Sequence, residues 1–225
     1  MRPYFKFLNE LEKNNQKEWM DANKKWYLST REEFLEDVGL ILKGISAWEP
    51  GMEVYKAKDC VFRINRDVRF SANKDPYKTN FAAYFSPKGK KSEGPGYYLN
   101  IKKGKSMIGG GIWMPMSETL KKIRNEIDYS GSELQRIEAN PEFKKLFGEV
   151  QGERLKSKPR GYEIDHQYID YLRLKSFTVF ANISDSDVTS GNFINIALDG
   201  FRKMKPFLDF LSQAVDDVED GAGLV

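Results

Sequence analysis

Cysteine and histidine are each represented once in the 225 residues, by Cys60 and His166. A single cysteine excludes an intramolecular disulfide, which favours a reducing compartment, and we expect a cytoplasmic protein. A structural zinc site takes about four cysteine and histidine ligands, so the sequence predicts no metal site. Because Cys60 begins a strand-like apolar run with Val61 and Phe62, we expect a buried structural thiol and not a nucleophile.

Long hydrophobic runs are also absent. The longest apolar stretches, such as residues 38–45, contain a lysine or glycine. They fall far short of the roughly 20 residues that span a bilayer. The hydrophobic content of 40% and the charged content of 31% are typical of a globular protein. The sequence therefore predicts a soluble protein with no membrane partner and no cofactor, and it leaves the oligomeric state open.

Hydrophobic periodicity predicts helices at both ends of the chain. A first helix carries Phe5 and Leu8, and a second begins at Asn15 as its cap and continues for about thirty residues. Helices return after Pro115, and the last of them runs from about Ser190 to Val218. Asn140 followed by a proline predicts a capped helix start within this part.

In the middle of the chain the hydrophobic residues recur with a different period. Between residues 54 and 114, short β-branched or aromatic runs alternate with glycine and proline breakers. The expected strands are Val54–Tyr55, Val61–Ile64, Phe81–Phe85, Tyr97–Ile101 and Met107–Met114, with a further strand at Phe177–Ile183. The connections are too short for helical crossovers. We therefore expect an α+β fold in one domain, residues 1–225, with a central antiparallel β-meander packed against long N- and C-terminal helices.

Positive charge is concentrated in one segment. The net charge is only +3, yet thirteen Lys and Arg stand against four Asp and Glu between Lys56 and Lys105. Within this segment three arginines recur every third residue and two lysines follow. These candidate ligands for an anion are Arg63, Arg66, Arg69, Lys74 and Lys78.

Three other side chains of the same segment have expected roles. In an extended chain Arg63, Asp67 and Arg69 share a face, so Asp67 is expected to hold a guanidinium in place. Phe70 and Tyr77 could stack on a guanidinium or on a base. The alternative is a structural ion-pair network in which the arginines pair with Asp59, Asp67 and Asp75.

Two further features could carry chemistry. Gly110 and Gly111, followed by Trp113 and a helix, could let backbone N–H groups approach a phosphate, although close backbone packing explains them as well. No nucleotide-binding fingerprint is present. His166, which Asp165 could orient, is a candidate proton shuttle, and its alternative role is a cap or a surface group. His166 and Asp67 are thus the candidate catalytic residues.

The landmarks resemble one family. Asn14, Asn15 and Trp19, the Arg63–Thr79 run, Trp113 with Pro115, Arg124, and Pro159, Gly161, Tyr162 and His166 occur in the order that is typical of the conserved hypothetical family of bacteria and fungi known as domain of unknown function 2461. The resemblance covers nearly the whole chain and implies a single α+β domain with no assigned activity. Two positions depart from the family pattern, because Asn73 replaces a usual Asp and Gln167 a usual Pro.

Three functions follow from these features. The first is a protein or enzyme that binds a phosphate- or carboxylate-bearing small molecule through the Arg/Lys cluster. The second is a nucleic-acid-binding protein that uses the basic β-meander, with Tyr84, Phe85, Tyr97 and Tyr98 for stacking and Lys88, Lys90, Lys91, Lys102, Lys103 and Lys105 on phosphates. The third is a structural or protein-interaction domain with an internal ion-pair network. Whether the protein is an enzyme stays open.

Overall fold

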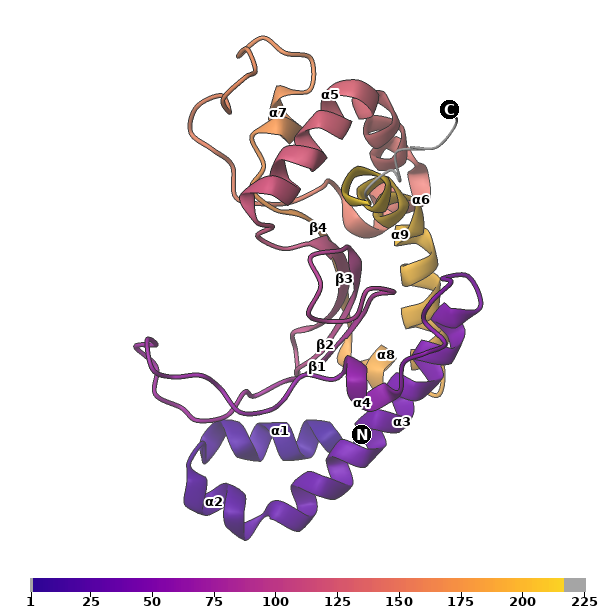
Figure 1. Ribbon diagram of the computed structural model, residues 1–225. Coiled ribbons are helices and arrows are strands. Elements are labelled where there is room, and N and C mark those ends of the chain that lie inside the picture. Colours follow the sequence, from indigo (N-terminus) through magenta and orange to yellow (C-terminus); the bar gives the residue numbers. More distant parts are fainter. Residues whose placement is uncertain (1, 217–225) are drawn as a thin grey trace, which may run out of the picture. The chain divides into compact units, whose positions relative to one another are not determined.

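A computed structural model describes residues 2–216 (Figure 1). The helices are α1 (Pro3–Lys13), α2 (Lys17–Ala22), α3 (Lys24–Ser46), α4 (Ala57–Cys60), α5 (Ser117–Ala139), α6 (Pro141–Phe147), α7 (Ile169–Leu172), α8 (Asp185–Thr189) and α9 (Phe193–Val215). The strands are β1 (Phe81–Phe85), β2 (Gly96–Ile101), β3 (Ser106–Ile112) and β4 (Phe177–Ile183). None of these helices is both long enough and apolar enough to cross a bilayer.

The four strands form one sheet in the order β1-β2-β3-β4. β1 pairs with β2 in antiparallel register, with Phe81 opposite Ile101 and Phe85 opposite Tyr97. The predicted α+β fold with an antiparallel sheet and flanking N- and C-terminal helices is confirmed. The strands at Phe81–Phe85 and Phe177–Ile183 have the predicted bounds, since their β-branched and aromatic residues suit a pleated, buried surface.

The chain divides into two compact units, and it passes between them several times. Unit 1 comprises Met1–Lys91, Tyr97–Gly109 and Phe180–Arg202, and unit 2 comprises Ser92–Gly96, Gly110–Val179 and Lys203–Val225. The single domain of residues 1–225 stays a prediction.

Aromatic side chains form the core of unit 1. The rings of Phe34 and Phe81 stack with centroids 5.2 Å apart, and the ring of Phe7 stacks with that of Phe81 at 6.4 Å. Tyr4 meets Phe34 edge-on at 6.1 Å. All four side chains are buried. Because the aromatic residues of α1 and α3 recur at helical spacing, one face of each helix turns toward β1.

The core of unit 2 is built around α5 and α6. Ile123, Ile127 and Leu134 of α5 are fully buried. The Phe143 ring lies 5.1 Å from that of Phe147. The predicted cap of α6 is confirmed, since the Asn140 side chain accepts hydrogen bonds from the first backbone N–H groups of the helix.

Three sequence predictions of secondary structure are wrong. The thirty-residue helix is two helices, α2 and α3, because the chain leaves the helical conformation at Asn23 (φ −106°, ψ 17°), whose side chain bonds the carbonyl of Trp19. Asn15 caps neither helix. The strands expected at Val54–Tyr55 and Val61–Ile64 do not form; Val61 makes only an isolated bridge to Ala83.

The C-terminal helix also begins later than predicted. Ser190 follows the short helix α8, and α9 begins only at Phe193. Pro206 lies inside α9. The predicted end at Val218 lies outside the described residues.

Candidate functional site

The arginine-rich segment is a long loop of unit 1 between α4 and β1. Figure 1 shows it running above α1 and α2 and reaching out to the left of the picture. Its two ends are joined: Arg66 N–H donates to the Pro76 carbonyl at 2.9 Å, and Lys78 N–H donates to the Ile64 carbonyl at 2.7 Å. The Asn15 side chain accepts from Tyr77 N–H and donates to its carbonyl. The base of the loop is therefore fixed by backbone bonds and by one amide side chain from before α2.

Two cations hold the outer part of the loop together through neutral acceptors. The Arg66 guanidinium donates to the Asp75 carbonyl at 3.0 Å and to the Ser71 hydroxyl at 3.2 Å. Lys74 Nζ donates to the Val68 carbonyl at 3.1 Å. Both cations keep their full charge in these bonds, because a carbonyl or hydroxyl oxygen carries no formal charge.

Arg69 is held by Asp67, as the sequence analysis expects. Nε lies 3.0 Å from Oδ1 and Nη2 lies 2.7 Å from Oδ2, and the Arg69 backbone N–H also reaches Oδ1. The Arg69 side chain, and to a lesser degree its backbone, lowers the pKa of Asp67 below its ordinary value. Both groups are exposed. Next to them Phe70 is 97% exposed, with the Arg69 guanidinium carbon 5.8 Å from its ring centroid.

Lys78 and Arg63 lie at the base of the loop. Lys78 Nζ donates to the Arg63 carbonyl at 3.0 Å and stands 5.6 Å from the centroid of the Phe62 ring. Burial, and then the positive charge of Arg63, lower the pKa of Lys78. The Arg63 guanidinium is exposed, and within the described residues it makes no hydrogen bond and no ion pair.

The pairing pattern of this segment differs from an internal ion-pair network. Among Arg63, Arg66, Arg69, Lys74 and Lys78, only Arg69 contacts a carboxylate within the described residues. The other two acids named for the network have other partners. Asp59 accepts from the Lys56 backbone N–H, and Asp75 accepts from the Asn73 side chain. Four of the five cations of this segment therefore make no ion pair with any carboxylate of residues 2–216.

The remaining expected ligand-binding residues do not join the exposed cations of the loop. Tyr77 is buried, with only 9% of its surface exposed. Gly110, Gly111 and Trp113 belong to unit 2. A Cβ on Gly111 would lie 2.0 Å from the Phe177 carbonyl oxygen, and its φ is +117°. Gly111 is thus required by close backbone packing and by its conformation, the alternative that the sequence analysis kept open.

The aromatic residues expected to form a stacking surface on the meander are mostly buried. Phe85 and Tyr97 are at most 1% exposed. Tyr84 and Tyr98 lie opposite each other on β1 and β2 and are half-buried, and burial raises the pKa of each above its ordinary value. Burial excludes Phe85 and Tyr97 from stacking on bases, whereas stacking by Tyr84 and Tyr98 stays a prediction.

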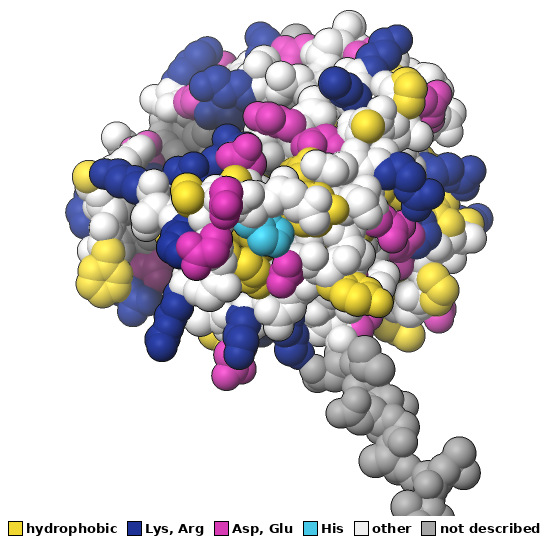
Figure 2. Space-filling model, turned by 90° about the horizontal axis from the view of Figure 1, so that it is seen from above, with side chains coloured by type: hydrophobic (Ala, Val, Ile, Leu, Met, Phe, Trp, Pro, Cys, Tyr) yellow, Lys and Arg dark blue, Asp and Glu magenta, His cyan; other side chains and the backbone are white. Residues whose placement is uncertain are grey.

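His166 lies in unit 2 and is oriented by a residue that the sequence analysis did not name. Its Nε2 lies 2.9 Å from Oδ1 of Asp128 in α5, whereas the expected partner was Asp165. Its Nδ1 accepts the backbone N–H of Tyr168 at 3.1 Å. An accepting Nδ1 carries no proton, so the ring is the neutral tautomer with the proton on Nε2, which donates to Asp128. Figure 2 shows the ring, in cyan, at the surface with acidic side chains nearby.

Other side chains of α5 extend this polar cluster. The Tyr162 hydroxyl lies 3.4 Å from Oδ1 of Asn125, and its ring meets His166 edge-on at 5.9 Å. Arg124 donates to the carbonyls of Leu172 and Leu174. Since Arg124 and Asp128 are four residues apart on α5, they share one helical face, and this spacing was the sequence signal for Asp128.

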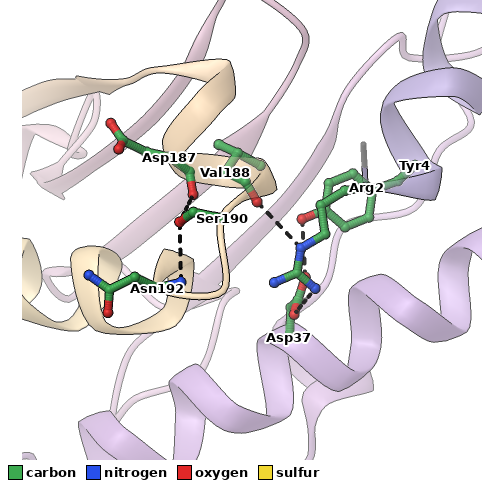
Figure 3. Close-up of polar contacts among 7 residues, drawn as sticks. All are labelled: Arg2, Tyr4, Asp37, Asp187, Val188, Ser190 and Asn192. Carbon is green, nitrogen blue, oxygen red and sulfur yellow. Dashed lines mark hydrogen bonds and ion pairs between the residues drawn. The ribbon is translucent and has the colours of Figure 1, made fainter.

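A second missed cluster joins α1, α3 and α8 in unit 1. Arg2 Nη1 lies 3.0 Å from Oδ1 of Asp37, and the Tyr4 hydroxyl donates to Oδ2 at 3.1 Å. Arg2 Nε reaches the Val188 carbonyl at 3.3 Å. Figure 3 shows the three side chains converging, with Ser190 close by in the turn after α8. Burial raises the pKa of Asp37, although Arg2 and Tyr4 oppose the shift.

Cys60 is buried at the end of α4, as the sequence predicts, although in a helix and not a strand. Burial, and then the charge of Asp59, raise the pKa of its thiol to about 11. The thiol therefore stays protonated near neutral pH and is a poor nucleophile. Among residues 2–216, no group of three or more His, Cys, Asp or Glu side chains could hold a metal ion.

Comparison with known proteins gives one match. The profile of the family described as "Conserved hypothetical protein (DUF2461)" matches residues 3–210. No curated protein and no solved structure matches the chain.

Proposed function

Because the chain belongs to this conserved hypothetical protein family, domain of unknown function 2461, whose description names no activity, we propose a function from the residues themselves. The protein binds phosphate-bearing anions at the loop of residues 63–78, which we call the cationic loop. We propose binding as the function of this loop, and it requires no chemical step.

The absence of carboxylate partners is the observation that carries this proposal. Arg63, Arg66, Lys74 and Lys78 have none among the described residues. Cations that repel one another cost free energy, and an internal network would have relieved that cost with Asp59 and Asp75. Burial, and then the positive charge of Arg63, lower the pKa of Lys78, in keeping with repulsion between the two cations. A bound anion would relieve it.

Three cations of this loop are also held in position before a ligand arrives. Arg66 and Lys74 are oriented by bonds to the loop itself, and Arg69 by its two-pronged contact with Asp67. A guanidinium has five N–H groups, and the contacts of Arg66 use one on each terminal nitrogen. The loop therefore offers oriented donors, which lowers the entropy lost on binding. Asp67 acts as a positioning residue in this arrangement.

A phosphate suits this loop better than a carboxylate does. Arginine forks fit both groups. The loop is an open surface where the ligand stays in contact with water, so net charge decides the affinity, and a polyphosphate carries more charge than a dicarboxylate of similar size. His166 has both ring nitrogens engaged and takes no part in this proposal. Its catalytic role stays a prediction.

Calorimetric titration with tripolyphosphate, with citrate as the carboxylate comparison, tests this proposal. We expect tripolyphosphate to bind more tightly than citrate, and Arg63→Gln to weaken its binding about fivefold at low salt. Arg160→Gln is the matched control, since Arg160 is also an exposed loop arginine without a partner among the described residues, but in unit 2. An equal loss in both variants, or no binding of tripolyphosphate at all, would overturn the proposal.

A further inference from the structure

The tip of the cationic loop presents an aromatic ring to solvent. Phe70 is 97% exposed, and it is the one exposed phenylalanine in the part of the chain that the structure describes. The bond from Arg66 to the Asp75 carbonyl and the bond from Lys74 to the Val68 carbonyl connect the two sides of the loop that carries Phe70. The ring is therefore carried by a braced loop and is open to a planar partner.

Cationic side chains belong to the same part of the loop as this ring. The Arg69 guanidinium carbon stands 5.8 Å from the ring centroid. Arg66 and Lys74, on either side of Phe70 in the sequence, have no carboxylate partner among the described residues. A nucleotide combines a phosphate with a planar base, and recognition of both requires cations beside an exposed aromatic face.

A single strand fits this loop better than a duplex or a lipid surface. Stacking on Phe70 requires a base whose face is uncovered, and the bases of a duplex cover one another. A loop that inserts into a membrane carries several exposed apolar side chains. Here Phe70 is followed by Ser71, Ala72 and Asn73, and Val68 is only partly exposed.

We propose that the cationic loop binds single-stranded nucleic acid. Phe70 stacks on one base, and Arg63, Arg66 and Lys74 neutralise neighbouring phosphates. This inference rests on the proposed anion binding and adds the class of ligand to it. Since bases are read only by stacking, the preference among base sequences is weak, and affinity falls steeply as salt is raised.

Fluorescence anisotropy with a labelled oligothymidylate of about 15 nucleotides tests the inference. An abasic strand of the same length supplies the same phosphates without the bases. We expect Phe70→Leu to weaken oligothymidylate binding roughly 10-fold and to leave abasic-strand binding unchanged. Phe70→Trp keeps an aromatic face and should bind at least as tightly as the wild type. Because the side chain is exposed, both variants should unfold at the wild-type temperature.

Phe70→Leu also distinguishes a nucleic-acid partner from a membrane partner. Leucine inserts into lipid about as well as phenylalanine, so binding to phosphatidylserine vesicles that survives Phe70→Leu, without oligothymidylate binding, would overturn the inference in favour of a membrane surface. Equal binding of the oligothymidylate and abasic strands, unaffected by Phe70→Leu, would overturn the stacking and leave anion binding intact. Failure of oligothymidylate, abasic strand and tripolyphosphate alike would overturn both proposals.

Discussion

Two arginines of unit 1 are used in opposite ways. Arg2 contacts the buried carboxylate of Asp37, which also accepts the Tyr4 hydroxyl, and so connects α1 to α3. Arg66 donates to a carbonyl and a hydroxyl of its own loop and contacts no carboxylate among the described residues. The first arrangement neutralises the charge, whereas the second leaves it uncompensated.

This difference between the two arginines distinguishes side chains that stabilise the fold from side chains that are available to bind a ligand. A buried ion pair is costly to break, because removal of one partner leaves the other charged or polar group unsatisfied. An exposed cation with neutral partners can exchange contacts for a ligand at little cost to the fold. Loss of the Asp37 cluster should therefore change the stability of the protein, and loss of the cationic loop should change its affinity.

The largest expected effect is on stability. Asp37→Ala leaves the Arg2 guanidinium and the Tyr4 hydroxyl without their acceptor, and we expect it to lower the free energy of unfolding by about 3 kcal/mol. Urea unfolding followed by circular dichroism measures the change. Asp67→Ala is the matched control, since it removes the carboxylate of an exposed pair and should leave the free energy of unfolding almost unchanged. Equal losses in the two variants would contradict the comparison.

The next effect is on affinity. Arg66→Ala removes two bonds that span the loop and one uncompensated charge. We expect tripolyphosphate affinity to fall about tenfold, while the unfolding temperature changes by no more than about 2 °C. Calorimetry and a thermal melt on the same sample give both quantities. A large drop in melting temperature with unchanged affinity would make Arg66 a structural residue.

The sequence predicts what local chemistry determines. Phe81–Phe85 and Phe177–Ile183 have the expected bounds because β-branched and aromatic residues define them, and Asn140 caps α6 through bonds to its immediate neighbours. The loop cations were likewise visible as a run of Arg and Lys. The sequence did not predict which residues, distant along the chain, contact one another.

Three such long-range contacts decide the roles of the side chains involved. Asn15 bonds Tyr77, 62 residues later, and Asp128 replaces Asp165 as the partner of His166. Asp37 interrupts an apolar helical stripe in the sequence, and only the folded chain brings Arg2 to it. The positions of Asp37 and Asp128 along their helices could indicate that these acids have polar partners, but only the tertiary fold determines which residues those partners are.

The two carboxylates of the comparison should titrate on opposite sides of the ordinary aspartate value. Burial raises the pKa of Asp37, and the Arg69 contacts lower that of Asp67. Folding therefore favours the protonated form of Asp37, and this pH-dependent part of the stability is present at low pH and is lost as pH rises through the raised pKa. The contacts of the ionised carboxylate with Arg2 and Tyr4 offset part of that loss. The stability that Asp67 contributes is present above the ordinary aspartate pKa and is lost as pH falls through its lowered pKa. Carboxyl carbon NMR titration measures both midpoints, and a midpoint for Asp37 below that for Asp67 would contradict the assignment.

The smallest expected effect concerns Arg69, the cation of the cationic loop that pairs with Asp67. Asp67→Asn keeps the size of the side chain and removes the only carboxylate of residues 2–216 that contacts any of the five cations. The added positive charge should raise tripolyphosphate affinity about twofold at about 50 mM salt, and the gain should disappear at about 200 mM as screening increases. Asp170→Asn, at an exposed carboxylate of unit 2, should change nothing. Asp67→Asn could instead lower the affinity for tripolyphosphate. In that case the orientation of Arg69 by Asp67 matters more for binding than the negative charge of Asp67, and the loop binds anions through oriented donors more than through its net positive charge.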